Sequence, residues 1–386
     1  MNPKRSSYRL VIAVALFSLS CLASAQTSAF RQPKGPGKIT VRTKFGGNIF
    51  GFDIDQNGTE GVLADVKQFN NGQVLSAVET FDQKTGKILT VITKRVTPVD
   101  DDIVIGIVGT STAIVEHEHA PCGLCFVSKR PYHLISPLDA NQYTGLWEPP
   151  HFDKNDIVFG VSRNQGAPMA AFIVLDNIFP GFNNFVISWD LVKNTFGPEI
   201  KMTDPNFEPY LTPVFALDTK TNMAVLAGDP GCVEGCSPDI GLVDLASGEF
   251  THFAGLGDGA ANGLAVDSED GIACTTTAND SNVQFYDLKT KTGFTELLPG
   301  AANGRIQSGT DVEFDPIHKL FLIGQPVSST GVGSSIQVYD PQGNLVESVN
   351  GFGSSSLNLA FSYIALLPKQ RSGFVNAPPG LRSFTY

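Results

Sequence analysis

The sequence has no long apolar run after its first 25 residues, so no later segment is long enough to cross a bilayer as a helix. The early apolar run, residues 10–19, is itself too short for a span. It follows several basic residues and precedes Ala23-Ser24-Ala25, a pattern typical of a secretory signal peptide (residues 1–25). We therefore expect cleavage after Ala25 and a secreted or periplasmic protein without an integral membrane segment.

Basic residues are also scarce. The chain has 27 Lys and Arg residues against 38 Asp and Glu residues, a formal net charge of −11. Removal of residues 1–25 would take away basic residues and no acidic ones, so the mature chain would be still more acidic. Because such a surface repels phosphate groups, we expect no nucleic-acid partner and no adhesion to anionic lipid.

The common catalytic signatures are missing as well. The sequence contains no G-x-S-x-G elbow, no H-E-x-x-H motif and no phosphate-cradling glycine loop with a lysine. These absences give no support to a serine hydrolase, a zincin or a nucleotide-dependent enzyme.

What the sequence does contain is a series of short apolar alternations, broken by Gly, Asn, Asp and Pro, with no convincing amphipathic helix. This pattern indicates antiparallel β-structure. One phrase, a strand that enters an acidic turn, recurs about every fifty residues, at residues 214–218, 263–267 and 311–315. Each occurrence is followed by further strands, so that a unit holds four.

A fifty-residue period with four strands per unit predicts an all-β fold, a single β-propeller of seven blades. Six blades is the alternative count, because the units before residue 201 are irregular. We expect residues 26–37 to form a flexible lead-in and residues 38–386 to form the propeller. The last unit has strands at 357–361 and 363–367, and room for one more in 374–386. An N-terminal strand at 39–45 would complete that blade and close the ring.

The repeated phrase resembles the NHL, YVTN and SMP-30 (gluconolactonase-like) propellers over nearly all of the mature chain. The closest local match is Asn262-Gly-Leu-Ala-Val-Asp267, which looks like the segment that carries a central metal-binding Asn in gluconolactonase-like proteins. That resemblance implies a metal-dependent lactonase-like hydrolase or lyase with its site in the central channel. The two other ligands of that family, a Glu near the start of the first blade and a late Asp, have no assigned counterpart in this sequence.

The loops that enter the inner strands of a propeller form one rim of its channel, which is the default ligand site. The rim candidates are Arg163, Asn164, Asn262, Asn303, Asp311 and Asn358. Oxygen ligands that converge there could hold Ca²⁺ or another hard cation. The alternative is that these side chains only satisfy the backbone of turns.

A second candidate metal site is Asp53-Ile-Asp55-Gln-Asn57-Gly58, which matches the first half of a calcium loop. Position twelve of that loop is Ala64, where a bidentate Glu is needed, so Glu60, Asp65 or a neighbour would have to complete the site. A simple turn between two strands explains the same residues.

A third candidate combines His117 and His119 with Cys122 and Cys125. The two histidines share one side of a strand, and the thiolates follow closely, which would suit Zn²⁺ or copper. In an oxidising compartment, a Cys122–Cys125 disulfide is the competing interpretation.

The other cysteines are expected to be structural. Cys232 and Cys236 form a second disulfide candidate within one loop, and Cys274 is expected to lie buried in a strand.

From these observations we expect a monomeric binding protein whose channel rim holds a protein, peptide or glycan ligand. The rival hypothesis is the metal-dependent hydrolase or lyase. Fold class alone does not choose between them, because propellers host enzymes and scaffolds alike.

Overall fold

The described part of the computed structural model lies within the range Gly35–Tyr386. Within it, the described residues are 35–97, 100–109, 111–119, 132–140, 142–147, 157–162, 165–176, 183–202, 214–228, 238–299, 309, 311–325, 334–352, 364–377 and 380–386. The predicted signal peptide, residues 1–25, lies outside them. Across these ranges, no helix has the length and apolar character needed for a transmembrane span.

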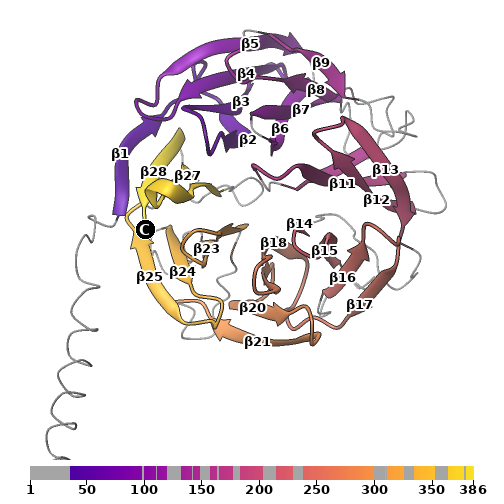
Figure 1. Cartoon of the computed structure of the whole chain (residues 1–386). Coiled ribbons are helices and arrows are strands. Elements are labelled where there is room, and N and C mark those ends of the chain that lie inside the picture. Colours follow the sequence, from indigo (N-terminus) through magenta and orange to yellow (C-terminus); the bar gives the residue numbers. More distant parts are fainter. Residues whose placement is uncertain are drawn as a thin grey trace, which may run out of the picture. The chain divides into compact units, whose positions relative to one another are not determined.

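Seven antiparallel sheets of four strands each form a ring (Figure 1). The first blade contains β2 (Asn48–Ile54), β3 (Glu60–Gln68), β4 (Val74–Asp82) and β5 (Ile88–Thr97). The second contains β6 (Asp100–Val108), β7 (Thr112–His119), β8 (Tyr132–Ile135) and β9 (Gly145–Trp147). The third contains β10 (Ile157–Val161), β11 (Met169–Asp176), β12 (Asn183–Asp190) and β13 (Thr195–Lys201).

The next three blades follow the repeated phrase. The fourth contains β14 (Val214–Asp218), β15 (Met223–Gly228), β16 (Asp239–Asp244) and β17 (Phe250–Phe253). The fifth contains β18 (Ala261–Asp267), β19 (Ile272–Thr277), β20 (Asn282–Asp287) and β21 (Thr292–Leu297). The sixth contains β22 (Asp311–Asp315), β23 (Leu320–Gln325), β24 (Ser335–Tyr339) and β25 (Leu345–Asn350). The prediction of a seven-bladed propeller is confirmed.

The seventh blade joins the two ends of the unit. It contains β26 (Ile364–Leu367), β27 (Ser372–Ala377), β28 (Gly380–Thr385) and, as its outermost strand, β1 (Gly35–Val41). The predicted closure by the N-terminal strand is therefore confirmed.

Two details of the seventh blade differ from the sequence-based expectation. The tail holds two strands, β27 and β28, where one was expected; they pair as antiparallel neighbours, with Ala377 opposite Gly380. In addition, β1 begins at Gly35, inside the predicted lead-in. The strand expected at residues 357–361 lies outside the described residues.

Burial of both faces of each sheet explains why a strand such as β23 has an unbroken apolar run, residues 320–323. In β23, Leu320 and Leu322 pack toward the seventh blade, whereas Phe321 and Ile323 pack toward the fifth. Such a two-sided strand has nearly every residue buried. Each of the seven contacts between neighbouring blades holds one cluster of buried apolar side chains. Cys274 lies in one of them, fully buried, as the sequence predicted.

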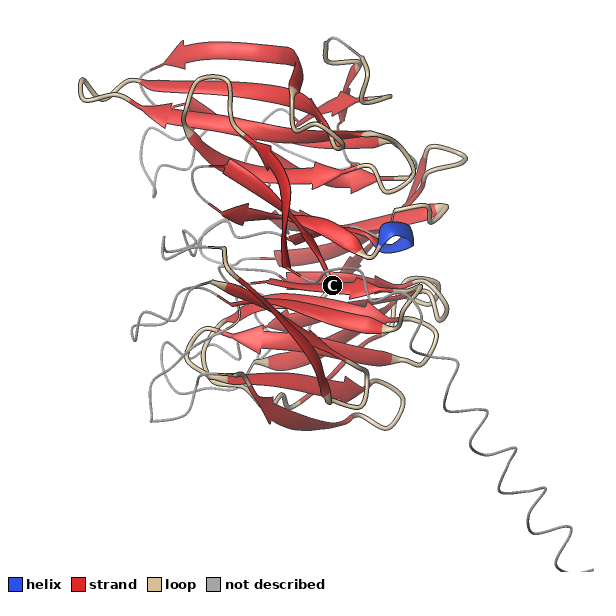
Figure 2. Ribbon diagram, turned by 90° about the vertical axis from the view of Figure 1, so that its left-hand side faces the viewer, coloured by secondary structure: helices blue, strands red, loops and turns tan. Residues whose placement is uncertain are grey.

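One face of the ring is built from tight turns between the first and second strands and between the third and fourth strands of the blades (Figure 2). The repeated acidic residue opens these turns. Asp218, Asp267 and Asp315 each accept backbone N–H groups from residues two and three positions further on. The recurring Asp is therefore a turn residue.

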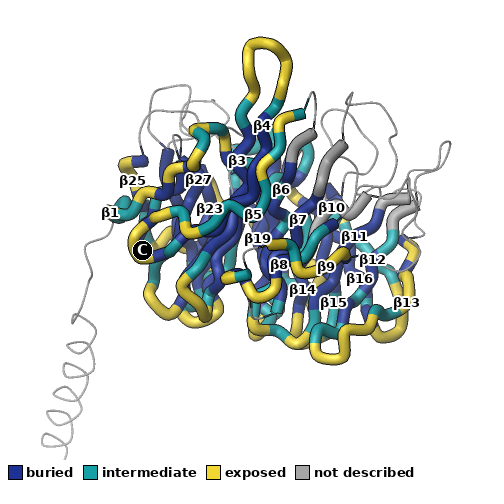
Figure 3. The backbone as a smooth tube through the Cα atoms, turned by 90° about the horizontal axis from the view of Figure 1, so that it is seen from above, coloured by how far each residue is buried: buried dark blue, intermediate teal, exposed yellow. Residues whose placement is uncertain are grey.

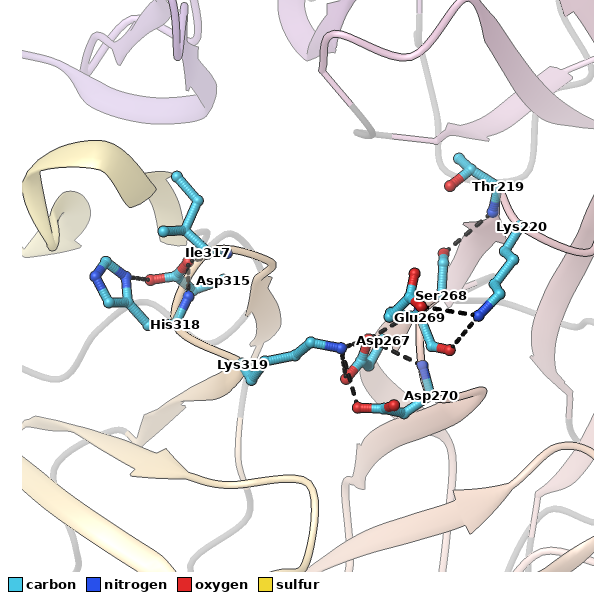
Figure 4. A network of polar contacts seen from close by, with 10 residues as sticks. All are labelled: Thr219, Lys220, Asp267, Ser268, Glu269, Asp270, Asp315, Ile317, His318 and Lys319. Atoms are coloured by element: carbon cyan, nitrogen blue, oxygen red, sulfur yellow. Dashed lines mark hydrogen bonds and ion pairs between the residues drawn. The ribbon is translucent and has the colours of Figure 1, made fainter. Parts of the chain in front are cut away.

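Ion pairs connect the turns of neighbouring blades on this face (Figure 4). Lys319 of the sixth blade contacts Asp267 and Asp270 of the fifth, at 3.2 and 3.0 Å. From the other side, Lys220 of the fourth blade lies 3.0 Å from Glu269. The fifth blade's turn is thus held between two lysines, which connect the turns of the fourth, fifth and sixth blades.

The closure of the ring can be tested at Gly380. A Cβ atom on Gly380 would overlap the carbonyl oxygen of Val41 in β1, whereas one on Gly145 would meet nothing within 4 Å. We expect Gly380→Ala to lower the free energy of unfolding by about 1–3 kcal/mol, because an added methyl group forces the two strands apart. Urea unfolding measures this, with Gly145→Ala as the matched control. Equal midpoints for both variants would contradict the role of this close approach.

Candidate functional site

The predicted rim is the end of the ring where each innermost strand begins. Asn262 is the second residue of β18, and Asp311 is the first residue of β22 in the next blade. The structure brings their strands into direct contact, since a Cβ on Gly263 would lie 2.9 Å from the Cα of Asp311. The other rim candidates, Arg163, Asn164, Asn303 and Asn358, lie outside the described residues.

Asn262 is half-buried and bridges the fifth and sixth blades. Its Nδ2 atom donates a hydrogen bond to the Gly309 carbonyl at 2.9 Å. Within the described part of the chain, its amide oxygen accepts no hydrogen bond. Asn262 is therefore oriented by one neighbour while its oxygen is able to accept from a ligand.

Asp311 has a different environment. Its carboxylate is buried, and Oδ2 accepts the backbone N–H of Ile364 in β26 at 2.6 Å. Asp53 forms the same kind of bridge in the first blade, where Oδ2 accepts the N–H of Ile107 in β6 at 2.8 Å. Each carboxylate joins one innermost strand to the next. Both candidates thus have a structural role that sequence spacing did not reveal.

The candidate calcium loop forms a hydrogen-bonded turn. Oδ1 of Asp55 accepts the N–H groups of Asn57 and Gly58, both at 2.8 Å. The Asn57 amide oxygen in turn accepts from Lys369 Nζ at 3.0 Å. These contacts are those of a turn that an Asp side chain stabilises. Asp65, considered as a completing ligand, lies near the other end of β3.

The metal hypotheses stay predictions. Over the described ranges there is no group of three or more His, Cys, Asp or Glu side chains that could hold a metal ion. His117 and His119 belong to β7, where they pair in register with Asp102 and Asp100. Their side chains, and residues Cys122, Cys125, Cys232 and Cys236, lie outside the described part, so the two disulfides also stay predictions.

A group that the sequence analysis missed lies between the seventh and first blades. Asp65 and Glu79 are fully buried and face the segment that joins β1 to β2. Asp65 accepts the N–H groups of Phe45 and Gly47, at 2.9 and 2.8 Å. Glu79 accepts the N–H of Lys44 at 3.1 Å. We call these two carboxylates and the three amides the carboxylate clasp.

Burial sets the acidity of the clasp. Desolvation raises the pKa of Glu79 to about 7, against an opposing contribution from the Lys44 amide, and the neighbouring Asp65 raises it further. The pKa of Asp65 is also raised by burial, although the amides of Phe45 and Gly47 lower it. Glu79 therefore titrates close to neutral pH.

The sequence does hold a signal for the clasp. Asp65 interrupts the apolar run of β3, and Glu79 interrupts that of β4. Charged residues are seldom buried without partners, so an acid inside a two-sided strand indicates a local set of donors. The donors come from the segment before β2, which sequence spacing does not place nearby.

Comparison with known proteins supports the fold alone. No protein-family model matches the chain, and no curated protein matches it. Among solved structures, the chain is similar to U3-55K with a TM-score of 0.57 and 11% sequence identity, over 91% of this chain and 100% of that one. The fold and the rim therefore define a seven-bladed β-propeller, a class that includes proteins with many unrelated functions.

Ionisation of Glu79 predicts a specific pH dependence. Between about pH 4.5 and 7 the folded state binds more protons than the unfolded state, so stability falls as the pH rises through this window. We expect Glu79→Gln to remove this contribution, which amounts to about 3 kcal/mol at most. The variant should therefore gain stability over the wild type at pH 8 and not at pH 4.

Urea unfolding at a series of pH values measures the difference between the two proteins. Glu249→Gln, at an exposed position, is the control and should leave the dependence unchanged. If the free energy of unfolding of Glu79→Gln changed with pH in parallel with that of the wild type, the clasp would not titrate in this range.

Proposed function

We propose that this protein is an exported β-propeller that binds a protein, peptide or glycan partner at the rim where the innermost strands begin. The supporting observation is the difference between the two faces of the ring. On the opposite face, ion pairs connect the short Asp-anchored turns of the fourth, fifth and sixth blades. The longest stretches of sequence between consecutive strands, about a dozen residues each, follow β7, β13, β21 and β25, strands whose last residues lie on the rim side.

Long connections on a rigid scaffold are typical of binding surfaces, because they vary without disturbing the packed sheets beneath them. The polar ends of the innermost strands add hydrogen-bonding groups, of which the Asn262 amide oxygen is one. An acidic chain with net charge −11 favours a partner that is not a polyanion.

A metal-dependent lactonase-like hydrolase or lyase is the second candidate, on the model of the SMP-30 propellers. It is favoured by the same Asn262 oxygen, which lies at the rim and accepts no hydrogen bond from the described residues. In this alternative, Asn262 would hold a cation, and the cation would polarise a substrate carbonyl.

Substitution at the rim tests the binding proposal. We expect wild-type protein to bind a ligand on peptide and oligosaccharide arrays, and Asn262→Arg to abolish that binding, because the long cation would cover the rim. Val192→Arg is the matched control, since Val192 is 79% exposed in a turn of the opposite face. Loss of binding in the control, or retention in both variants, would contradict the proposal.

A lactone panel distinguishes the two candidates. A binding protein should show no hydrolysis above the uncatalysed rate, with or without added Ca²⁺, Zn²⁺ or Mn²⁺. A metal-dependent rate that EDTA removes and that Asn262→Ala abolishes would instead establish the hydrolase.

A further inference from the structure

The first blade extends beyond its neighbours on the rim face. β3 and β4 have nine residues each and β5 has ten, whereas the strands of the adjacent seventh blade have four to seven. Figure 3 shows the hairpin loop between β3 and β4 projecting from the blade, exposed along its length. One side of this extension is the side on which Leu63 and Phe81 pack against the seventh blade, and further along the sheet it is exposed at Val96.

Strand register places several side chains on this side. Lys67 pairs with Leu75, and Leu75 pairs with Val96, so the three share one sheet face. Lys94 lies on the same face, because it pairs with Ala77, which itself pairs with Asp65 of the clasp. The same face thus combines apolar and basic side chains.

Two aromatic rings complete the surface. Lys94 Nζ lies 4.4 Å from the ring centroid of Phe45, and Lys67 Nζ lies 5.9 Å from that of Phe69. Lys67 also donates a hydrogen bond to the Phe45 carbonyl at 3.1 Å. We call Phe45, Lys67, Phe69, Lys94 and Val96 the blade-1 patch.

The patch combines exposed apolar and basic side chains. Val96 is 49% exposed and Phe69 is 37% exposed. Lys44 and Lys94 are exposed and Lys67 is half-buried, whereas the nearby carboxylates of Asp65 and Glu79 are buried and accept backbone amides. A basic and apolar patch therefore stands on a chain whose net charge is −11.

The carboxylate clasp holds the backbone of the blade-1 patch at Phe45 in one conformation before a partner binds. Asp65 holds the amide of Phe45, and a Cβ atom on Gly47 would overlap the Asp65 carboxylate, so the segment follows one close path. A surface that is already ordered loses little conformational entropy when a partner binds.

The side chains of the blade-1 patch indicate which kind of ligand would bind there. A few ammonium groups beside exposed apolar side chains complement a short segment that carries both carboxylates and apolar side chains. A long polyanion fits poorly, because beyond three lysines it would extend over an acidic surface.

We propose that the blade-1 patch binds a short acidic peptide segment of the partner. This inference rests on the proposed function, because it names the chemistry of a partner that the rim face binds. Carboxylates of the segment would pair with Lys67 and Lys94, and its apolar side chains would cover Phe69 and Val96.

The test uses a fluorescein-labelled peptide of alternating Glu and Leu residues, with fluorescence anisotropy as the readout. We expect the wild type to bind it, with an affinity that falls as salt increases. The double variant Lys67→Glu/Lys94→Glu should bind about tenfold more weakly. The control Lys84→Glu/Lys87→Glu reverses two exposed lysines at the other end of the same blade and should bind as the wild type does.

A second variant guards against misfolding, because Lys67 also contacts the Phe45 carbonyl. Lys94→Gln/Phe69→Ser leaves that hydrogen bond in place and should weaken binding as well, with thermal unfolding confirming that the variant is folded. Equal weakening in the Lys84→Glu/Lys87→Glu control would overturn the inference. So would equal binding of a Lys-Leu peptide, tighter binding of polygalacturonate, or no binding by the wild type.

The outcomes separate this inference from the proposed function. Array binding that Asn262→Arg abolishes and Lys67→Glu/Lys94→Glu leaves unchanged would overturn the acidic-peptide inference alone. Absence of any array ligand sensitive to Asn262→Arg would overturn the proposed function itself.

Discussion

The need to bury two apolar faces of every sheet governs this structure. A single four-stranded blade would leave both of its apolar faces exposed to water. An open row of blades would still expose one apolar face at each end of the row. Only a closed ring covers them all, and closure depends on the pairing of β1 with β28. The packing of all seven apolar clusters therefore depends on the one between the seventh and first blades, although that cluster is similar in size to the others.

Polar groups are placed between blades where backbone amides can satisfy them. Asp311 and Asp53 accept amides from the next innermost strand, and Asp65 and Glu79 accept amides from the segment before β2. Buried carboxylates without such donors would destabilise the fold. The rim and the blade-1 patch lie at the ends of these strands, so the groups that join the blades also position the surfaces proposed for binding.

The sequence alone predicted the architecture, because the strands and turns of each blade follow from local sequence patterns. Alternation, acidic turns and a fifty-residue period predicted seven blades and closure by the N-terminal strand. The number of strands in the tail was missed, since the antiparallel pairing that places Ala377 opposite Gly380 was not predicted from the sequence. The functions of Asp311, Asp65 and Glu79 depend on donors from distant segments, and one sequence without register does not place those donors. Asn262 was found because its position at the start of β18 is local.

The joining of the chain's ends in one blade also affects how the protein is made. β1 is synthesised before the other strands of the ring, and β28, to which Ile39 and Ser383 connect it across 344 positions, is synthesised after them. A ribosome must therefore complete the other six blades before the seventh blade can form. Copies that end before β28 keep the apolar sides of their first and last blades open, which makes them prone to aggregation.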